Sequence, residues 1–518
     1  MKKVSKLLAV VMAFSIMVAL NVAVFATTTK TDGTKANVVN GGETVKINVL
    51  TGNENDVLNA YKVVETIYDK NTNTINRNFT ATFEQFTAAN TEYKTMTVDD
   101  YVKLNETKLK EVLGKFVSYV RTNSVNPEYV STNISNEEKA EFEAVAMGQY
   151  IIVGSGNTNG AYIYQAVTAE VEPFVENDEY KIYEQYSVKM KVSKPTVEKD
   201  IINGTATDGN RQTASVGDVI TYKLSAAVPI YPEGATDTTL YLGDELSEGL
   251  TLDLNSIVVK GENGENSKNL TSGNQYTIKE EGQKFYVDLN YGKIKTYTTV
   301  TVEYKATLNE KAKVGTAVGN ENIVEYVYKN SPFDGTTYNS EDSDRPTPDT
   351  PGFGDDDDKE IVYTFGVAIE KIDKDNNAVK LKNAKFKLYD NKECKGDAIK
   401  EIVTNENGIA SFEGLKAGKY YLVETMAPSG YKKLLETIEI VVNAASGIYT
   451  ITADKTEITT DIEKENGYKK VTVENKKGAT LPTAGGMGTA LFVAGGLIIM
   501  LGAATGVYVI RRKTVKER

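Results

Sequence analysis

Residues 365–373 read FGVAIEKID, and this stretch sets the fold of the region around it. A β-strand places alternate side chains on the same face, so Phe365, Val367 and Ile369 predict one apolar face. Lys371 continues that face. The pattern therefore predicts a strand that points a lysine into a hydrophobic core, where an unpaired charge is costly.

Two later stretches show the same anomaly. Asn475 shares a face with two valines in VTVEN, residues 471–475, and Glu424 shares a face with Tyr420 and Leu422 in YYLVET, residues 420–425. Three polar groups thus face inward from three strands, and buried polar groups almost always find partners. We expect Lys371, Glu424 and Asn475 to meet.

Such a meeting makes one reaction available. Burial lowers the pKa of a lysine and raises that of a glutamic acid, so a neutral amine and a protonated acid can coexist at neutral pH. Glu424 can polarise the Asn475 carboxamide while the Lys371 amine attacks it and ammonia leaves. The expected product is an intramolecular isopeptide bond.

An earlier region repeats this logic. Lys199 shares a face with Val197 and Ile201 in PTVEKDI, residues 195–201, and Asn322 is in phase with the apolar residues of NIVEYVY, residues 322–328. Lys199 and Asn322 are therefore a second predicted pair, with Asn320 as the competitor for the amide.

Most of the chain between its two ends reads as short alternating strands separated by turns, which predicts an all-β fold of tandem immunoglobulin-like β-sandwich domains. The first domain carries helical insertions. Apolar residues recur at helical spacing from Leu109 to Val120 behind a cap at Thr97, and Ser135 with Glu138 resembles a capping box for a second, shorter helix.

Composition excludes several classes of protein. The 518 residues contain no histidine and one cysteine, Cys394, so Ser-His-Asp catalysis, His-containing zinc sites and intramolecular disulfides are ruled out. The formal net charge of -12 argues against nucleic acid as a partner. We predict no metal and no cofactor. A run of aspartates at 355–358 lacks the spaced ligands of a calcium loop.

The two ends predict a location. Lysines precede an apolar run that closes on Val24, Phe25 and Ala26, which is typical of a signal peptide over residues 1–26. Residues 490–510 form an uncharged apolar stretch long enough to span a bilayer, and a basic tail follows. That order predicts a transmembrane helix with a cytoplasmic tail and the rest of the chain outside.

The sequence LPTAGG precedes that stretch, and the arrangement resembles the cell-wall sorting signal of Gram-positive surface proteins, which sortase transpeptidases read. The usual pattern is Leu-Pro-any-Thr-Gly, whereas the fourth position here is Ala484. The resemblance implies cleavage between Ala484 and Gly485, within a recognition segment made of Leu481, Pro482, Thr483, Ala484 and Gly485.

YYLVETMAPSGY, residues 420–431, resembles the E-box of Cna-B-type pilin and adhesin domains, and EKIDKD and VTVENKKG resemble that family's first and last strands. The resemblance implies that Lys371 and Asn475 are linked and that Glu424 is the catalytic acid. LYLGDELSEGLTL resembles the aspartate-bearing strand of the Cna-A-like middle domain of shaft pilins, which implies Asp244 as the acid for Lys199 and Asn322.

We expect the signal peptide at 1–26 to be followed by an N-terminal pilin domain at 27–190 and a Cna-A-like isopeptide domain at 191–340. A solvated acidic linker rich in Pro and Gly follows at 341–360, then a Cna-B-type isopeptide domain at 361–478 and the sorting signal at 479–518. Lys62 is a candidate for a bond in the first domain, but no matching Asn is evident.

The whole chain resembles a sortase-assembled major (shaft) pilin of a Gram-positive cell wall. The resemblance implies as partners sortase, identical subunits and peptidoglycan, reached directly or through a base pilin, and it allows a host or matrix ligand. A pilus also needs a lysine to receive the activated carboxyl; Lys194 is the first choice and Lys191 the alternative. The rival interpretations are a monomeric wall-anchored adhesin and, more remotely, a wall-anchored glycosidase working with two carboxylates.

Overall fold

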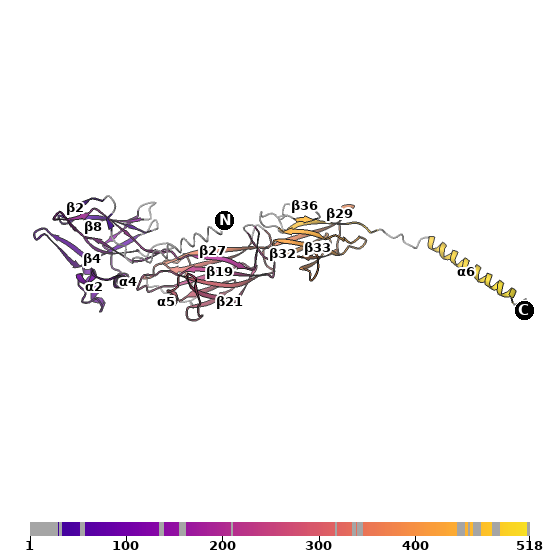
Figure 1. Cartoon of the computed structure of the whole chain (residues 1–518), viewed down its shortest axis with the longest axis horizontal. Coiled ribbons are helices and arrows are strands. Elements are labelled where there is room, and N and C mark those ends of the chain that lie inside the picture. The colour runs from indigo at the N-terminus through magenta and orange to yellow at the C-terminus, as the bar shows by residue number, and fades with distance from the viewer. Residues whose placement is uncertain are drawn as a thin grey trace. The chain divides into compact units, whose positions relative to one another are not determined.

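The structure is a computed structural model that describes residues 29–30, 34–51, 57–133, 139–154, 162–208, 211–315, 319–333, 338, 345–442, 451–453, 456–458, 468–478 and 487–514. The predicted signal peptide and residues 481–485 lie outside these ranges. The chain forms two compact units (Figure 1). Unit 1 comprises Met1–Gly204, Val219–Lys311 and Asn320–Ile361, and unit 2 comprises Thr205–Asp218, Ala312–Gly319 and Val362–Arg518.

Unit 1 begins with two five-stranded sheets. One has the order β1 (Thr29–Lys30), β14 (Gln185–Lys189), β3 (Thr44–Leu50), β8 (Lys139–Ala146), β7 (Thr132–Asn133). The other runs β11 (Val167–Val171), β9 (Gly148–Gly154), β4 (Leu58–Asp69), β5 (Thr74–Phe79), and β6 (Tyr129–Val130) joins it on β4. Smaller sheets are formed by β12 (Phe174–Glu176), β13 (Glu179–Tyr183) and β2 (Ala36–Val38), and by β10 (Ile163–Tyr164) with β15 (Val192–Ser193).

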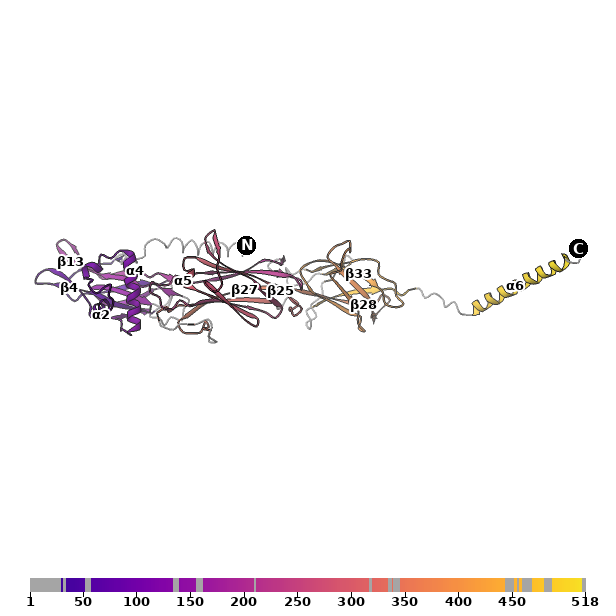
Figure 2. The same ribbon diagram turned by 90° about the horizontal axis from the view of Figure 1, so that it is seen from below.

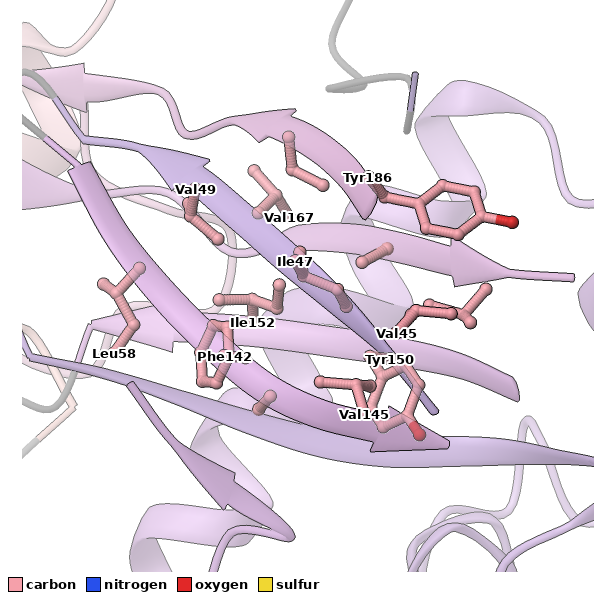
Figure 3. Close-up of a cluster of buried hydrophobic side chains, with 14 of the residues drawn as sticks. Val45, Ile47, Val49, Leu58, Phe142, Val145, Tyr150, Ile152, Val167 and Tyr186 are labelled. Atoms are coloured by element: carbon pink, nitrogen blue, oxygen red, sulfur yellow. The ribbon is translucent and has the colours of Figure 1, made fainter. Parts of the chain in front are cut away.

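The core of this first sandwich lies between the inward faces of its sheets. Val45, Ile47 and Val49 alternate along β3, and they pack with Tyr150 and Ile152 of β9 (Figure 3). The other face of β9 carries Ile151 and Val153, which belong to a second cluster made with the helices. Because both faces of β9 are covered, all of its residues are buried.

Three helices contribute to that second cluster, together with β4 and β9: α2 (Ala81–Ala89), α3 (Val98–Tyr101) and α4 (Glu106–Thr122). The helical spacing up to Val120 is confirmed, and Figure 2 shows α4 lying across the strands. Thr97 does form a capping box, but it caps the short α3, and Asn105 is the N-cap of α4. The helix expected after Ser135 is wrong, because Lys139–Ala146 pairs with β3 as a strand.

The remainder of unit 1 is a second sandwich, called the middle sandwich or middle domain below. One sheet has the order β16 (Val197–Asn203), β19 (Val219–Ala227), β25 (Thr299–Leu308), β21 (Leu250–Asn263), β22 (Asn266–Asn269). The facing strands run β27 (Phe353–Tyr363), β26 (Asn320–Lys329), β20 (Leu240–Leu246), β24 (Lys284–Leu289), β23 (Tyr276–Glu281), with the short helix α5 at Tyr291–Ile294. Alternation along β25 buries Val300, Val302, Tyr304, Ala306 and Leu308.

The acidic segment of this sandwich corrects an expectation. Residues 353–360 were expected to belong to a solvated linker, but they form most of strand β27, which lies beside β26. Contacts also fix the turn that precedes this strand. Arg345 forms an ion pair with Asp288, and its guanidinium carbon Cζ lies 4.0 Å from the centroid of the Tyr286 ring. The composition of this segment predicted exposure to solvent. The segment instead forms a strand of the sheet, because its charged side chains have partners there.

Unit 2 contains a sandwich of two four-stranded sheets. One places β28 (Phe365–Asp373) beside β29 (Asn376–Lys380), β32 (Ile409–Leu415) and β37 (Tyr468–Asn475); the other has the order β31 (Lys400–Val403), β30 (Lys385–Tyr389), β33 (Gly418–Met426), β34 (Ile438–Val442). The apolar face predicted for residues 365–369 is confirmed in its core. β17 (Ala206–Asp208) pairs with β18 (Arg211–Thr213), and β18 pairs in turn with the end of β27 at Val362 and Tyr363. A short pair of β35 (Ile451–Ala453) with β36 (Thr456–Ile458) completes the unit.

Helix α6 spans Met487–Thr514 and contains the stretch expected at 490–510. In the part of the chain that the structure describes, no helix is both long enough and apolar enough to cross a membrane. Side chains 490–492 and 509–510 lie outside that part, and the spanning role of this stretch stays a prediction.

Candidate functional site

The sandwich of unit 2 brings Lys371, Glu424 and Asn475 together. The parallel pairing of β28 with β37 sets Lys371 opposite Val473 and Asp373 opposite Asn475, so the lysine and the asparagine are close diagonal neighbours. Glu424 reaches them from β33 in the other sheet. Lys371 and Glu424 are fully buried, and Asn475 is 2% exposed.

The contacts within this cluster connect all three groups. Lys371 Nζ lies 2.5 Å from Asn475 Oδ1 and 3.3 Å from Glu424 Oε1. Asn475 Nδ2 donates to Glu424 Oε1 at 2.9 Å and to Oε2 at 3.2 Å. The backbone N–H of Leu434 donates to the same carboxylate at 2.5 Å. The amine is therefore beside the amide it would attack, and the carboxyl touches both.

Burial makes the Lys371 amine easier to deprotonate. Removal from water lowers the pKa of Lys371 to about 8, although the nearby Glu424 carboxylate opposes the shift. A usable fraction of the amine is thus neutral near physiological pH, which is the form that can act as a nucleophile.

A second buried cluster lies in the middle sandwich of unit 1. Lys199 comes from β16, Asp244 from β20 and Asn322 from β26, so the lysine and the other two groups belong to facing sheets. Lys199 Nζ donates to Asp244 Oδ2, and the side chains of both residues are completely buried. Removal from water lowers the pKa of Lys199 and raises the pKa of Asp244, and the opposite charge of each opposes the shift of the other.

Tyr304 of β25 completes the cluster of Lys199, Asp244 and Asn322, a role that no sequence pattern predicted. Its hydroxyl accepts from Lys199 Nζ at 2.9 Å and from Asn322 Nδ2 at 2.8 Å, and it donates to Asp244 Oδ1 at 2.8 Å. The contact with Asn322 favours this residue over Asn320, the competing amide, which is buried on the same strand.

The two candidate linking lysines differ in their surroundings. Lys194 is exposed, with its Nζ 5.8 Å from the centroid of the Tyr162 ring. Lys191 is half-buried, and burial followed by the nearby Lys110 lowers the pKa of its amine. Lys62 lies on β4 with its Nζ 6.0 Å from the Tyr150 ring. Within the described ranges, no group of three or more acidic or cysteine side chains could hold a metal ion.

Three family profiles match the chain. A profile described as "Gram-positive pilin backbone subunit 2, Cna-B-like domain" matches residues 216–332, "Prealbumin-like fold domain" matches residues 365–457, and "LPXTG cell wall anchor motif" matches residues 473–516. The first of these describes residues 216–332 as Cna-B-like, whereas the sequence resemblance of this region was to the Cna-A-like type.

Relatives extend the match to most of the chain. The chain is 28% identical over 484 residues to the trypsin-resistant surface T6 protein of Streptococcus pyogenes serotype M6, which covers 80% of this chain and 88% of that protein. The T6 backbone pilin structure covers 84% of this chain and 98% of its own, with 23% identity and a TM-score of 0.61. The full-length major pilin SpaD of Corynebacterium diphtheriae covers 85% and 98%, with 16% identity and a TM-score of 0.50.

Through these matches the chain resembles the major pilins of Gram-positive bacteria, with immunoglobulin-like and prealbumin-like domains and a match to the cell-wall anchor motif. Among the named relatives it is similar to the T6 pilin of Streptococcus pyogenes over most of its length. It is therefore a structural subunit of a cell-surface pilus.

Proposed function

We propose that sortase joins this chain into a covalent pilus fibre, and that Lys371–Asn475 and Lys199–Asn322 isopeptide bonds reinforce each subunit. The observation that carries the proposal is the burial of a lysine, an asparagine and an acid in one cluster at two independent places in the chain. The three groups are in direct contact in unit 2. In the other cluster Lys199 contacts Asp244 directly, and Tyr304 connects Asn322 to both. Buried charges are expensive unless they are paired, and here the pairing also sets up a reaction.

In unit 2 the reaction follows from the contacts. The neutral Lys371 amine attacks Cγ of Asn475, and its new N–C bond replaces the C–Nδ2 bond. One proton passes from Nζ to Glu424, and Glu424 delivers a proton to Nδ2, which leaves as ammonia. Glu424 contacts both nitrogens, so it can carry out both transfers without moving.

The polymer requires a second amide, between subunits. Sortase would cleave between Ala484 and Gly485 and pass the Ala484 carbonyl to a lysine of the next subunit. Lys194 is our first choice because it is exposed at the boundary between the first two predicted domains, and Lys191 is the alternative because its lowered pKa favours the nucleophilic form. The wall itself is reached by the same chemistry, directly or through a base pilin.

The polymerisation proposal is tested by incubating the ectodomain, with its sorting signal intact, with a sortase from a Gram-positive bacterium. A ladder of high molecular mass that resists boiling in detergent is expected from the wild type. The ladder should disappear in either Lys194→Ala or Lys191→Ala, while Lys189→Ala, which changes an exposed lysine of β14, should leave it intact. A ladder that persists when both lysines are replaced would contradict the assignment, and no ladder from the wild type would favour a monomeric wall-anchored adhesin.

A further inference from the structure

Tyr304 has an unusual position for a core tyrosine. Its side chain is 1% exposed, its ring stacks on Tyr222 with centroids 5.4 Å apart, and Phe285 packs against it edge to face. This packing fixes the ring, and the hydroxyl is consequently held in the middle of the Lys199, Asp244 and Asn322 cluster.

The hydroxyl of Tyr304 uses its full hydrogen-bonding capacity. A phenol has one donor and two acceptor positions. The donor goes to Asp244 Oδ1 at 2.8 Å, and the acceptors take Lys199 Nζ at 2.9 Å and Asn322 Nδ2 at 2.8 Å. One oxygen atom therefore touches the nucleophile, the acid and the nitrogen that must leave.

The two candidate sites differ at this point. In unit 2 the Asn475 nitrogen donates directly to the Glu424 carboxylate. In the middle sandwich the Asn322 nitrogen donates to Tyr304, and it is Tyr304 that donates to Asp244. Aspartate is one methylene shorter than glutamate, and the phenol spans the gap that this leaves.

We propose that Tyr304 is a catalytic residue of the middle domain, which relays a proton between Asp244 and the leaving nitrogen of Asn322. This inference rests on the proposed isopeptide reaction and adds a group to it. It also separates the two sites by mechanism, since the acid acts directly in unit 2 and through a phenol in unit 1.

The relay balances. The Lys199 amine forms a bond to Cγ of Asn322, and the C–Nδ2 bond breaks. Tyr304 gives its proton to Nδ2 and takes one from the protonated Asp244, so that nitrogen leaves as ammonia. Asp244 then recovers a proton from Nζ, which becomes the amide N–H. Tyr304 and Asp244 end in the states in which they began.

The environment keeps Tyr304 in the form that the relay needs. Burial raises the pKa of Tyr304 well above its ordinary value. The residue is therefore a phenol at neutral pH and has a proton to give. Concerted transfer in and out avoids a buried phenolate, which the same burial would make costly.

Replacing Tyr304 by phenylalanine tests this role, because it removes only the hydroxyl. The matched control is Tyr326→Phe, which removes another fully buried hydroxyl of the same sandwich that donates to the backbone oxygen of Ala227 at 2.9 Å. Full-length ectodomain is made by cell-free synthesis, stopped at intervals in acidic denaturant, and weighed by intact mass spectrometry. Peptide mapping assigns each loss of ammonia to its domain.

In Tyr304→Phe we expect the Lys199–Asn322 bond to form about a hundredfold more slowly, within the range of general acid–base catalysis, while Lys371–Asn475 forms at the wild-type rate. Tyr326→Phe should form both bonds normally. Wild-type rates for both bonds in Tyr304→Phe would overturn the relay. If the wild type itself loses no ammonia, the isopeptide proposal has failed, which is a different result.

Some loss of folding in Tyr304→Phe would be visible as protease sensitivity that Tyr326→Phe does not show. In that event a second variant carries 3,5-difluorotyrosine at position 304. This residue keeps the ring and the hydroxyl of tyrosine but makes the phenol more acidic. A relay predicts a changed rate for the middle-domain bond alone. An unchanged rate would overturn the proposal, because a purely structural hydroxyl would still be present.

Discussion

At the scale of single residues, the reactive groups owe their chemistry to burial. Lys371 and Glu424 have no exposed side-chain surface, and the loss of water lowers the pKa of Lys371 to about 8. The ordinary value is near 10.4, at which almost every lysine in a neutral solution is protonated. The fold therefore creates the nucleophile, and the reaction can begin only after the strands have assembled.

The pKa of Lys371 predicts a pH dependence for formation of the bond in unit 2. Below that pKa the amine is mostly protonated and cannot attack, so the rate should increase about tenfold per pH unit from pH 6 and level off near pH 8. The rate is measured by transferring newly synthesised protein to buffers of different pH and following its intact mass over time. A rate independent of pH from 6 to 8 would show that deprotonation of Lys371 does not limit the reaction.

The sequence predicted some of these residues and missed another for a clear reason. Lys371, Asn475 and Glu424 stand out because each is a polar residue on an otherwise apolar face, and the structure brings them into contact. Tyr304 lies on an equally apolar face, where a tyrosine is an ordinary core residue. Its hydroxyl acquires a role only through the packing of two sheets, which a single strand does not reveal.

At the scale of elements, the acidic strand β27 closes one edge of the middle sandwich. Asp356 Oδ2 accepts the backbone N–H of Val197 at 2.8 Å, and Asp358 Oδ2 accepts that of Lys199 at 2.9 Å. These N–H groups belong to β16, the edge strand of the facing sheet. Two carboxylates thus fix the strand that carries the reactive lysine.

Removal of the Asp358 carboxylate should loosen β16. In an Asn322→Ala background, where no bond can form in this domain, Asp358→Ala is expected to lower the free energy of unfolding by about 1.5–3 kcal/mol, the usual contribution of a hydrogen bond to a charged group. Asp357→Ala changes the exposed neighbour on the opposite face and should be nearly neutral. Chemical denaturation measures both, and equal effects of the two variants would argue against the edge contact.

The same strand shows where composition misleads. Four consecutive aspartates that directly follow a proline- and glycine-rich stretch are typical of a solvated linker. In a strand, however, alternate side chains point to opposite faces. Asp356 and Asp358 therefore face β16, whereas Asp357 faces solvent. The partners of Asp356 and Asp358 are backbone N–H groups more than a hundred residues away in the sequence, so the local sequence could not predict these contacts.

At the scale of the whole molecule, each proposed bond would join strands from opposite ends of a domain's sequence. In unit 2 the bond would link β28, the first strand of the sandwich, to β37, the last, and the residues are 104 positions apart. Tension along a fibre would then pass through covalent links. The sheets would not have to unzip, although a folded domain without such links has only about 5–15 kcal/mol of stability.

The loop closed in unit 2 predicts a measurable stabilisation. In the chain-entropy model, a crosslink around a loop of that size contributes roughly 4–5 kcal/mol. Asn475→Ala should therefore unfold at much lower temperature and become sensitive to protease within residues 371–475. Thermal unfolding followed by limited proteolysis checks this, with Asn376→Ala, an exposed asparagine on β29, as the control. Equal stability of Asn475→Ala and the wild type would contradict the stabilising role.

The intact mass of the secreted ectodomain shows whether each subunit carries two internal amide crosslinks. With both crosslinks, the wild-type mass is expected to lie below the sequence mass by two molecules of ammonia. Asn475→Ala and Asn322→Ala should each fall short of their own sequence masses by only one. A wild-type ectodomain with the full sequence mass would mean that neither crosslink forms.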